Sequence, residues 1–142
     1  MPVAYVIDDN RETADSLAQW LSLLSYDAQV LLGPLPALEA LAQRVPDLIF
    51  LDIHMQGMDG VEVCRYIRRD PRLAAVPVVA ISTDTQPSLI ERAREAGANG
   101  FLAKPVVFSD LEDVLDASER SAASARSRFG RVWRSLFPTR AA

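Results

Sequence analysis

Cysteine, histidine and lysine each occur once in this sequence of 142 residues, as Cys64, His54 and Lys104. A single cysteine cannot form an internal disulfide, so we interpret Cys64 as a small buried apolar residue. The sequence also shows no basic leader region and no apolar segment long enough to span a membrane. These absences predict a protein of a reducing compartment, the cytoplasm.

Lysine is scarce although basic residues are not, since 14 of the 15 are arginine. Residues 1–117 hold 18 acidic and 9 basic side chains, whereas residues 118–142 hold 1 acidic and 6 basic side chains. A chain of this length forms one domain with at most a short appendage. We therefore expect an acidic domain at residues 1–117 and a basic, Ser/Arg-rich tail at residues 118–142.

Short apolar stretches alternate with amphipathic ones along the domain. The apolar stretches, which predict strands, are residues 3–7, 28–32, 48–52, 77–81 and 100–103. Between and after them the apolar residues follow helical spacing, as in Val63, Tyr66 and Ile67, which we expect to face the core. Five strands alternating with five helices predict an α/β fold with a doubly wound, five-stranded parallel sheet.

Polar side chains stand where these strands end. Asp8 and Asp9 follow the first strand, Asp52 ends the third, and Lys104 follows the fifth. Ser82 follows the fourth strand in the same way. Because the carboxyl ends of parallel strands meet at one edge, where ligands collect, we expect these side chains to lie together. The alternative for the paired aspartates is a mere helix cap.

The residue types in this cluster are suited to phosphoryl transfer. Three carboxylates repel one another unless a hard cation sits among them, and oxygen ligands suit Mg²⁺. A hydroxyl and an ammonium group can position and neutralise an incoming phosphoryl group. Asp52 would then be the nucleophile and form an acyl phosphate. The position of the lone Lys104 fits this chemistry, since a compact ammonium on a flexible stem can reach both a phosphoryl oxygen and a carboxylate.

Five motifs follow one another at these strand ends. They are Val6-Ile7-Asp8-Asp9-Asn10, Leu51-Asp52-Ile53-His54-Met55, Met58-Asp59-Gly60, Ile81-Ser82-Thr83 and Ala103-Lys104-Pro105. With these motifs in this order and spacing, residues 3–117 resemble the receiver domain of bacterial two-component response regulators. The resemblance implies the CheY-like, flavodoxin-like fold with strand order 2-1-3-4-5.

The resemblance also implies roles for the cluster. Asp52 would accept a phosphoryl group from a histidine kinase or a histidine phosphotransfer protein. Asp8, Asp9, Asp52 and the backbone carbonyl of His54 would hold Mg²⁺. Ser82 would bond the phosphoryl group and move inward on activation, and Lys104 would pair with it.

The output of such a receiver is a protein-interaction surface. The resemblance implies that Phe101 is the rotating aromatic residue of the switch, and that the fourth helix, fifth strand and fifth helix form the responding face. It also implies that the peptide bond between Lys104 and Pro105 is commonly cis.

Four residues depart from the family pattern or require separate interpretation. Gln56 stands where proline is usual, which we expect to loosen the loop after Asp52. Thr83 stands where a smaller residue is common and would narrow access to the phosphoryl group, while Phe101 lacks the hydroxyl of the commoner tyrosine. We interpret His54 as a rim residue rather than a phosphodonor or a side-chain metal ligand. Together these features predict an altered phosphoryl lifetime.

The tail contains an apolar stripe that the resemblance does not explain. Residues 118–127 could be a linker or an extension of the last helix. The stripe, with the spacing of a short basic amphipathic helix, is Phe129, Val132, Trp133, Leu136 and Phe137. We favour packing of this stripe on the acidic receiver; the alternatives are docking on a second protomer, a kinase or, least favoured, an anionic membrane.

We therefore expect a stand-alone receiver that is not an enzyme beyond its own phosphorylation and autodephosphorylation. It would act through a downstream protein or as a phosphate sink. An aspartyl-nucleophile phosphatase of the haloacid-dehalogenase type is an alternative, but such enzymes need a second aspartate where His54 stands. Residues 118–142 are too few for a DNA-reading domain, so no nucleic-acid partner is expected. A pseudo-receiver that signals without phosphate remains a further alternative.

Overall fold

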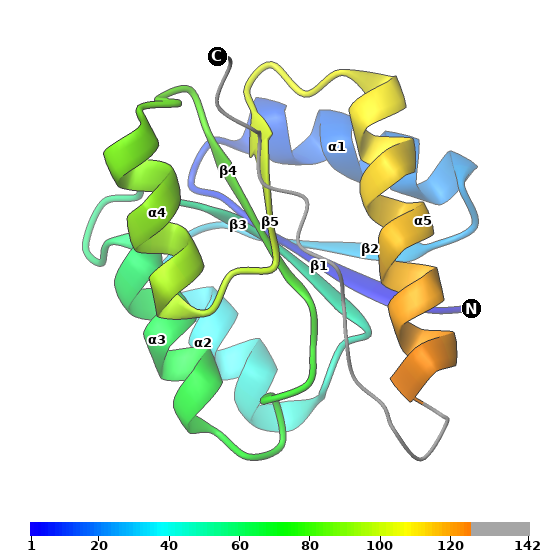
Figure 1. Ribbon diagram of the computed structural model, residues 1–142, viewed down its shortest axis with the longest axis horizontal. Coiled ribbons are helices and arrows are strands. Elements are labelled where there is room, and N and C mark those ends of the chain that lie inside the picture. The colour runs from blue at the N-terminus through cyan, green and yellow to red at the C-terminus, as the bar shows by residue number, and fades with distance from the viewer. Residues whose placement is uncertain (126–142) are drawn as a thin grey trace.

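Five strands and five helices alternate strictly in the part of the chain that the structure describes (Figure 1). This computed structural model describes the backbone of residues 1–125 and the side chains of residues 1–120. The strands are β1 (Val3–Ile7), β2 (Asp27–Leu31), β3 (Leu48–Asp52), β4 (Val78–Ser82) and β5 (Gly100–Ala103). The helices are α1 (Arg11–Leu23), α2 (Pro34–Gln43), α3 (Gly60–Arg69), α4 (Pro87–Ala96) and α5 (Phe108–Ala125). The alternation confirms the predicted α/β class.

The strands form a single parallel sheet in the order β2-β1-β3-β4-β5, as predicted. Every residue of β1, β3 and β4 is buried, which explains why these three strands are continuous apolar runs. The edge strand β2 is only partly buried. The chain enters the sheet at β1, adds β2 at the nearer edge, and then continues through β3 and β4 to β5 at the other edge. Because every pairing is parallel, all five strands end at the same edge.

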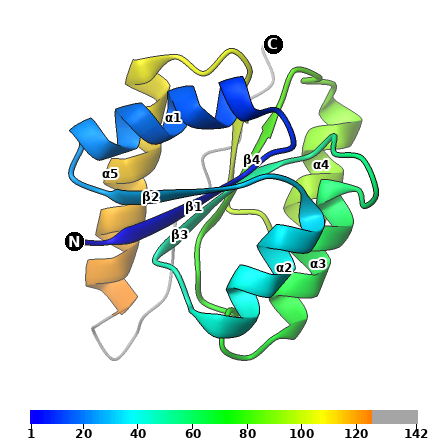
Figure 2. The ribbon, with the colours of Figure 1, turned by 180° about the vertical axis from the view of Figure 1, so that it is seen from behind.

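The sheet separates two helical layers and two hydrophobic cores. α1 and α5 cover one face, and α2, α3 and α4 cover the other (Figure 1 and Figure 2). Along β3, Leu48 and Phe50 belong to the core under α1 and α5, whereas Ile49 and Leu51 belong to the core under the other three helices. This alternation follows from the two-residue period of a strand. It leaves the backbone of β3 between the two cores, with apolar side chains packed on both faces.

Local sequence signals set the helix ends. The Asn10 side chain accepts a hydrogen bond from the Thr13 N–H at 3.0 Å and caps α1. Pro87 lies in the first turn of α4, and Gly97 ends that helix in the left-handed region with φ of 113°. A side chain at position 97 would also place its Cβ 2.5 Å from Arg68 Cγ, so glycine is required there for space as well.

The inward orientation expected for Tyr66 is wrong. Val63 and Ile67 are buried as expected, but the side chain of Tyr66 is 47% exposed. The buried stripe of α3 is formed by Gly60, Val63, Cys64 and Ile67, which recur every three or four residues, and Tyr66 lies beside this stripe. Cys64 is buried, in agreement with its predicted apolar role, and its Sγ lies 3.5 Å from the carbonyl oxygen of Ala96.

α5 continues to Ala125 and therefore crosses the expected domain boundary at residue 117. Of the two interpretations of residues 118–127, the structure supports an extended helix up to residue 125. The apolar stripe between Phe129 and Phe137, with the additional helix predicted there, lies outside the described residues. Across residues 1–125, none of the helices combines the length and the apolar composition needed to cross a membrane.

Candidate functional site

The strand ends bring together most of the residues predicted for the site. Asp8 follows β1, Asp52 ends β3, Ser82 ends β4 and Lys104 follows β5. Because all the strands are parallel, these positions lie along one edge of the sheet. Asp8, Asp52 and Ser82 are almost fully buried there, at 1%, 3% and 0% exposure. The cluster is thus a consequence of the topology.

Three carboxylates converge at this edge. Ligand atoms of Asp8, Asp9 and Asp52 all lie within 4.8 Å of one another. Each carboxylate also accepts a backbone hydrogen bond: Asp8 Oδ1 from Asn10 N–H at 2.9 Å, Asp52 Oδ1 from His54 N–H at 3.2 Å, and Asp9 Oδ2 from Gln56 N–H at 3.0 Å. Since Asn10 caps α1, the interpretation of the paired aspartates as mere helix caps is wrong.

Lys104 joins two of these carboxylates. Its Nζ lies 2.8 Å from Asp8 Oδ2 and 3.3 Å from Asp52 Oδ1, and its side chain is only 13% exposed. The peptide bond that follows Lys104 is cis, as expected. The single lysine of the chain therefore reaches from the end of β5 to carboxylates at the ends of β1 and β3, as expected from its position after the fifth strand.

The electrostatics of the cluster favour an added cation. The pKa of Asp52 is raised to about 7, chiefly by burial and then by the neighbouring Asp8 carboxylate, against the opposing effects of Lys104 and the His54 N–H. One ammonium thus leaves three carboxylates incompletely neutralised. Hard oxygen ligands at this separation suit Mg²⁺, so the residues present fit the metal that the sequence predicts.

The remaining predicted residues surround the cluster. Thr83 and His54 are exposed at its rim. Ser82 Oγ accepts a hydrogen bond from Asp84 N–H at 2.9 Å. Phe101 is buried in the core beneath α2, α3 and α4, so its ring lies on the α4 side of the sheet.

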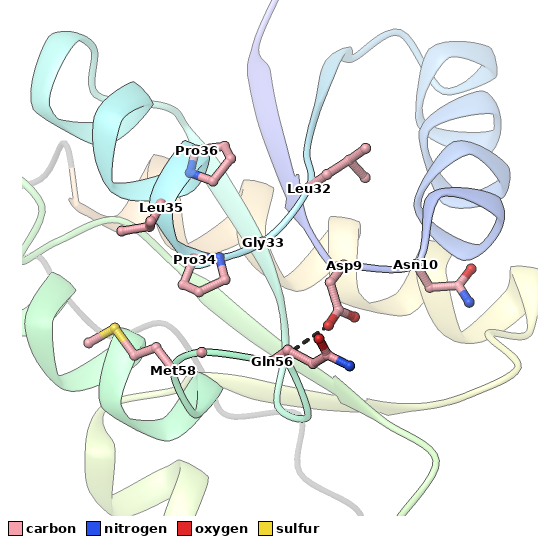
Figure 3. Close-up of a pocket in the computed structure, with 10 residues that line it drawn as sticks. Asp9, Asn10, Leu32, Gly33, Pro34, Leu35, Pro36, Gln56 and Met58 are labelled. Atoms are coloured by element: carbon pink, nitrogen blue, oxygen red, sulfur yellow. Dashed lines mark hydrogen bonds between the residues drawn. The ribbon is translucent and has the colours of Figure 1, made fainter.

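Among the hollows that adjoin the site, two differ clearly in size and position. The smaller, of about 390 Å³, lies between α1 and the segment that joins β5 to α5, and Trp20, Thr83 and Lys104 are among its lining residues. The larger, of about 730 Å³, is open and extends from Asp9 past the N-terminus of α2 to Met58 (Figure 3). Neither hollow was predicted, because each is lined by segments that are distant in the sequence and meet only after folding.

The structure adds one contact that sequence reasoning missed. Gln56 was expected to loosen its loop, yet its backbone N–H bonds Asp9 and ties the loop to the end of β1 (Figure 3). Backbone donors are present at every residue except proline, so side-chain type gave no direct signal. The absence of proline at position 56 was the one feature that could have indicated the bond.

The fold and this acidic edge define a CheY-like α/β domain. The sequence profile of the response regulator receiver domain matches residues 4–116, and the chain belongs to this family. The family assignment made from the five motifs is confirmed.

Individual relatives agree with the family match. The chain is 33% identical over 112 residues to the sensory/regulatory protein RpfC of Xanthomonas campestris, a match that covers 78% of this chain and 15% of RpfC. It is 32% identical over 115 residues to the DNA-binding dual master transcriptional regulator RpaA of Synechocystis, covering 81% of this chain and 46% of RpaA. The chain thus spans less than half the length of these relatives.

A solved structure matches in the same region. The signal receiver domain of a DNA-binding response regulator from Colwellia psychrerythraea is 29% identical, with a TM-score of 0.79 over 84% of this chain and 99% of that one. The solved chain is covered almost completely, so the shared unit is the receiver fold itself.

Proposed function

We propose that this receiver is switched by phosphorylation of Asp52. The observation that carries the proposal is the ion pairing of Lys104 Nζ with both Asp8 and Asp52, which places a buried cation beside the carboxylate at the end of β3. A phosphoryl group on Asp52 would lie against that ammonium. Asp8 and Asp52 both pair with Lys104 and accept a backbone hydrogen bond, and of the two Asp52 is the one that ends the buried strand β3.

In the proposed reaction, an Asp52 carboxylate oxygen attacks the phosphorus of a phosphohistidine. The new O–P bond forms as the P–N bond breaks, and the released imidazole takes up a proton. Asp52 must be ionised to attack. Lys104 then offers its ammonium to a phosphoryl oxygen, and Ser82 offers its hydroxyl.

Asp8, Asp9 and Asp52 would hold Mg²⁺, together with the backbone carbonyl of His54. When bound, the ion would neutralise charge on the carboxylates and on the phosphoryl oxygens. The Asp8 carboxylate is also held by Lys104 Nζ and by Asn10 N–H, so its orientation does not depend on the cation alone. Thr83 at the rim would limit access to the phosphoryl group and so affect its lifetime.

We propose that the consequence is a change at the α4-β5-α5 face. Ser82 would move toward the phosphoryl group, and Phe101, which packs on the α4 side, would change rotamer in response. The protein would act by binding a downstream protein, or a second copy of this chain, rather than by catalysis beyond its own phosphorylation and autodephosphorylation. We propose the cytoplasm as the compartment in which it acts.

A separate proposal concerns the role of the tail, residues 118–142. The outer surface of α5 bears exposed acids, among them Asp110, Asp113 and Asp116, whereas residues 126–142 contain five arginines and no acid. We propose that the apolar stripe between Phe129 and Phe137, which lies in this basic segment, packs on the acidic receiver and becomes available to a partner after phosphorylation. Deleting residues 126–142 should then change stability or partner binding, and no change in either would contradict the proposal.

The phosphohistidine route is tested by incubating the full chain with a phosphorylated histidine phosphotransfer protein and Mg²⁺. Phosphate-affinity electrophoresis then shows whether the phosphoryl group has passed from the donor to this chain. We expect a shifted band for the wild type and none for Asp52→Asn, with Asp59→Asn, an exposed aspartate outside the cluster, as a matched control that still accepts phosphate. Failure of the wild type with every donor tried, together with retained signalling in Asp52→Asn, would favour a phosphate-independent receiver instead.

A further inference from the structure

The loop from Ile53 to Asp59 is fastened to the receiver at two places. At its end, Gly60 N–H donates to the Ile53 carbonyl at 2.9 Å, and a Cβ on Gly60 would come within 2.3 Å of the Asp52 carbonyl oxygen. In its middle, Gln56 N–H donates to Asp9 Oδ2 at 3.0 Å across 47 positions of sequence. The second fastening connects the loop after β3 to the loop after β1 (Figure 3).

The three clustered carboxylates differ in how firmly they are held. Asp8 is buried and bound by both Lys104 and Asn10, and Asp52 is buried and bound by Lys104 and His54. Asp9 is exposed, and within residues 1–120 its only hydrogen-bond donor is Gln56 N–H. An exposed carboxylate with no such bond would sample several rotamers, so the orientation of Asp9 depends on this amide.

The bond from Gln56 N–H uses Asp9 Oδ2, and the other carboxylate oxygen of Asp9 remains available to bind a cation. Since ligand atoms of Asp9, Asp8 and Asp52 already lie within 4.8 Å, the amide holds Asp9 in a geometry that a small cation can use. Any residue except proline supplies this N–H. The Gln56 side chain is exposed and is not required for the bond.

We propose that Gln56 is a positioning residue whose backbone N–H orients Asp9 for a divalent cation and ties cation binding to the order of the 53–59 loop. The inference rests on the proposed role of Asp9 as a Mg²⁺ ligand. The loop after Asp52, which borders the larger hollow, would thus also determine how closely Asp9 is held in the orientation that binds the cation.

The test compares Gln56→Pro, which lacks the N–H, with Gln56→Ala, which keeps it, in the full chain. Mg²⁺ affinity is measured by titration calorimetry, and unfolding in EDTA monitors the fold. We expect Gln56→Ala to bind within about twofold of the wild type and Gln56→Pro to bind about fivefold more weakly, the loss typical of one hydrogen bond. Equal affinity in the proline variant and the wild type, or equal losses in both variants, would overturn the inference.

A second measurement does not depend on tolerance of proline. Amide hydrogen exchange at Gln56 is followed by NMR in EDTA, and we expect it to be slower in the wild type than in Asp9→Ala. Asp84→Ala is the matched control, because the Asp84 carboxylate accepts a similar backbone bond, from Gln86, and is not one of the three clustered carboxylates. Unchanged exchange in Asp9→Ala would overturn the inference, whereas a wild type that binds no Mg²⁺ at all would refute the metal proposal itself and this inference with it.

Discussion

Lys104 Nζ and Asp8 Oδ2 lie 2.8 Å apart although 96 positions separate the two residues in the sequence. In the sheet, β3 and β4 stand between the strands that carry them. The lysine therefore spans the carboxyl edge and contacts Asp52 on the way, at 3.3 Å. This buried pair fixes the geometry on which the proposed phosphoryl chemistry depends.

Removing the ammonium should destabilise the fold. Lys104→Met leaves Asp8, which is 1% exposed, without its charge partner, and breaking a buried pair from one side costs about 3 kcal/mol. Urea unfolding at neutral pH in EDTA measures the loss. Arg11→Met is the control, because its pair with Asp15 is long and exposed and is worth at most about 0.5 kcal/mol. Equal losses in both variants would contradict a structural role for the buried pair.

Asp52 should make stability depend on pH. Its pKa is raised to about 7 in the folded chain, chiefly by burial and then by Asp8, against about 3.9 in an unfolded chain. Between these values the folded state binds more protons than the unfolded state, so this carboxyl lowers stability as pH rises from about 4 to 7. Asp52→Asn should therefore be more stable than the wild type at pH 8, by about 1 kcal/mol or more, with the difference vanishing near pH 4. Parallel pH profiles from urea unfolding would contradict this prediction.

Mg²⁺ should stabilise the folded chain through the three carboxylates. At ten times its dissociation constant a bound ligand adds about 1.4 kcal/mol, which is visible as a rise in the thermal midpoint. We expect this rise in the wild type and its loss in Asp9→Asn, with NaCl at matched ionic strength as the control. A similar rise with NaCl alone would show general screening instead of a specific site.

Tyr26 should anchor the second half of α5. Its hydroxyl donates to Glu119 Oε2 at 3.1 Å, and the ring is 4% exposed. Tyr26→Phe should cost about 1 kcal/mol in the free energy of unfolding, and a double-mutant cycle with Glu119→Ala should recover most of that energy as coupling. Tyr66→Phe, on the exposed face of α3, is the matched control and should change little. Additive losses in the cycle would refute the anchor.

The sequence predicted the strand-end cluster because its signals were local. The run ending in Asp52 is apolar on both faces, and parallel topology then places Asp8, Ser82 and Lys104 beside it. Tyr66 was misplaced because helical periodicity gives the direction of a buried stripe but not its width. The bond from Gln56 to Asp9 was missed because it uses a backbone group that sequence does not distinguish. The unequal burial of Asp8 and Asp9 follows from tertiary packing and could not be read from two adjacent identical residues.

The most direct test of the central claim is the intact mass of the full chain after incubation with acetyl phosphate and Mg²⁺. The donor needs no knowledge of the natural kinase, so the result reports the chemistry of the site alone. The account predicts the gain of one phosphoryl group in the wild type, its loss in EDTA, and its absence in Asp52→Ala. A gain of the same size in Asp52→Ala would contradict the assignment of Asp52 as the phosphoacceptor.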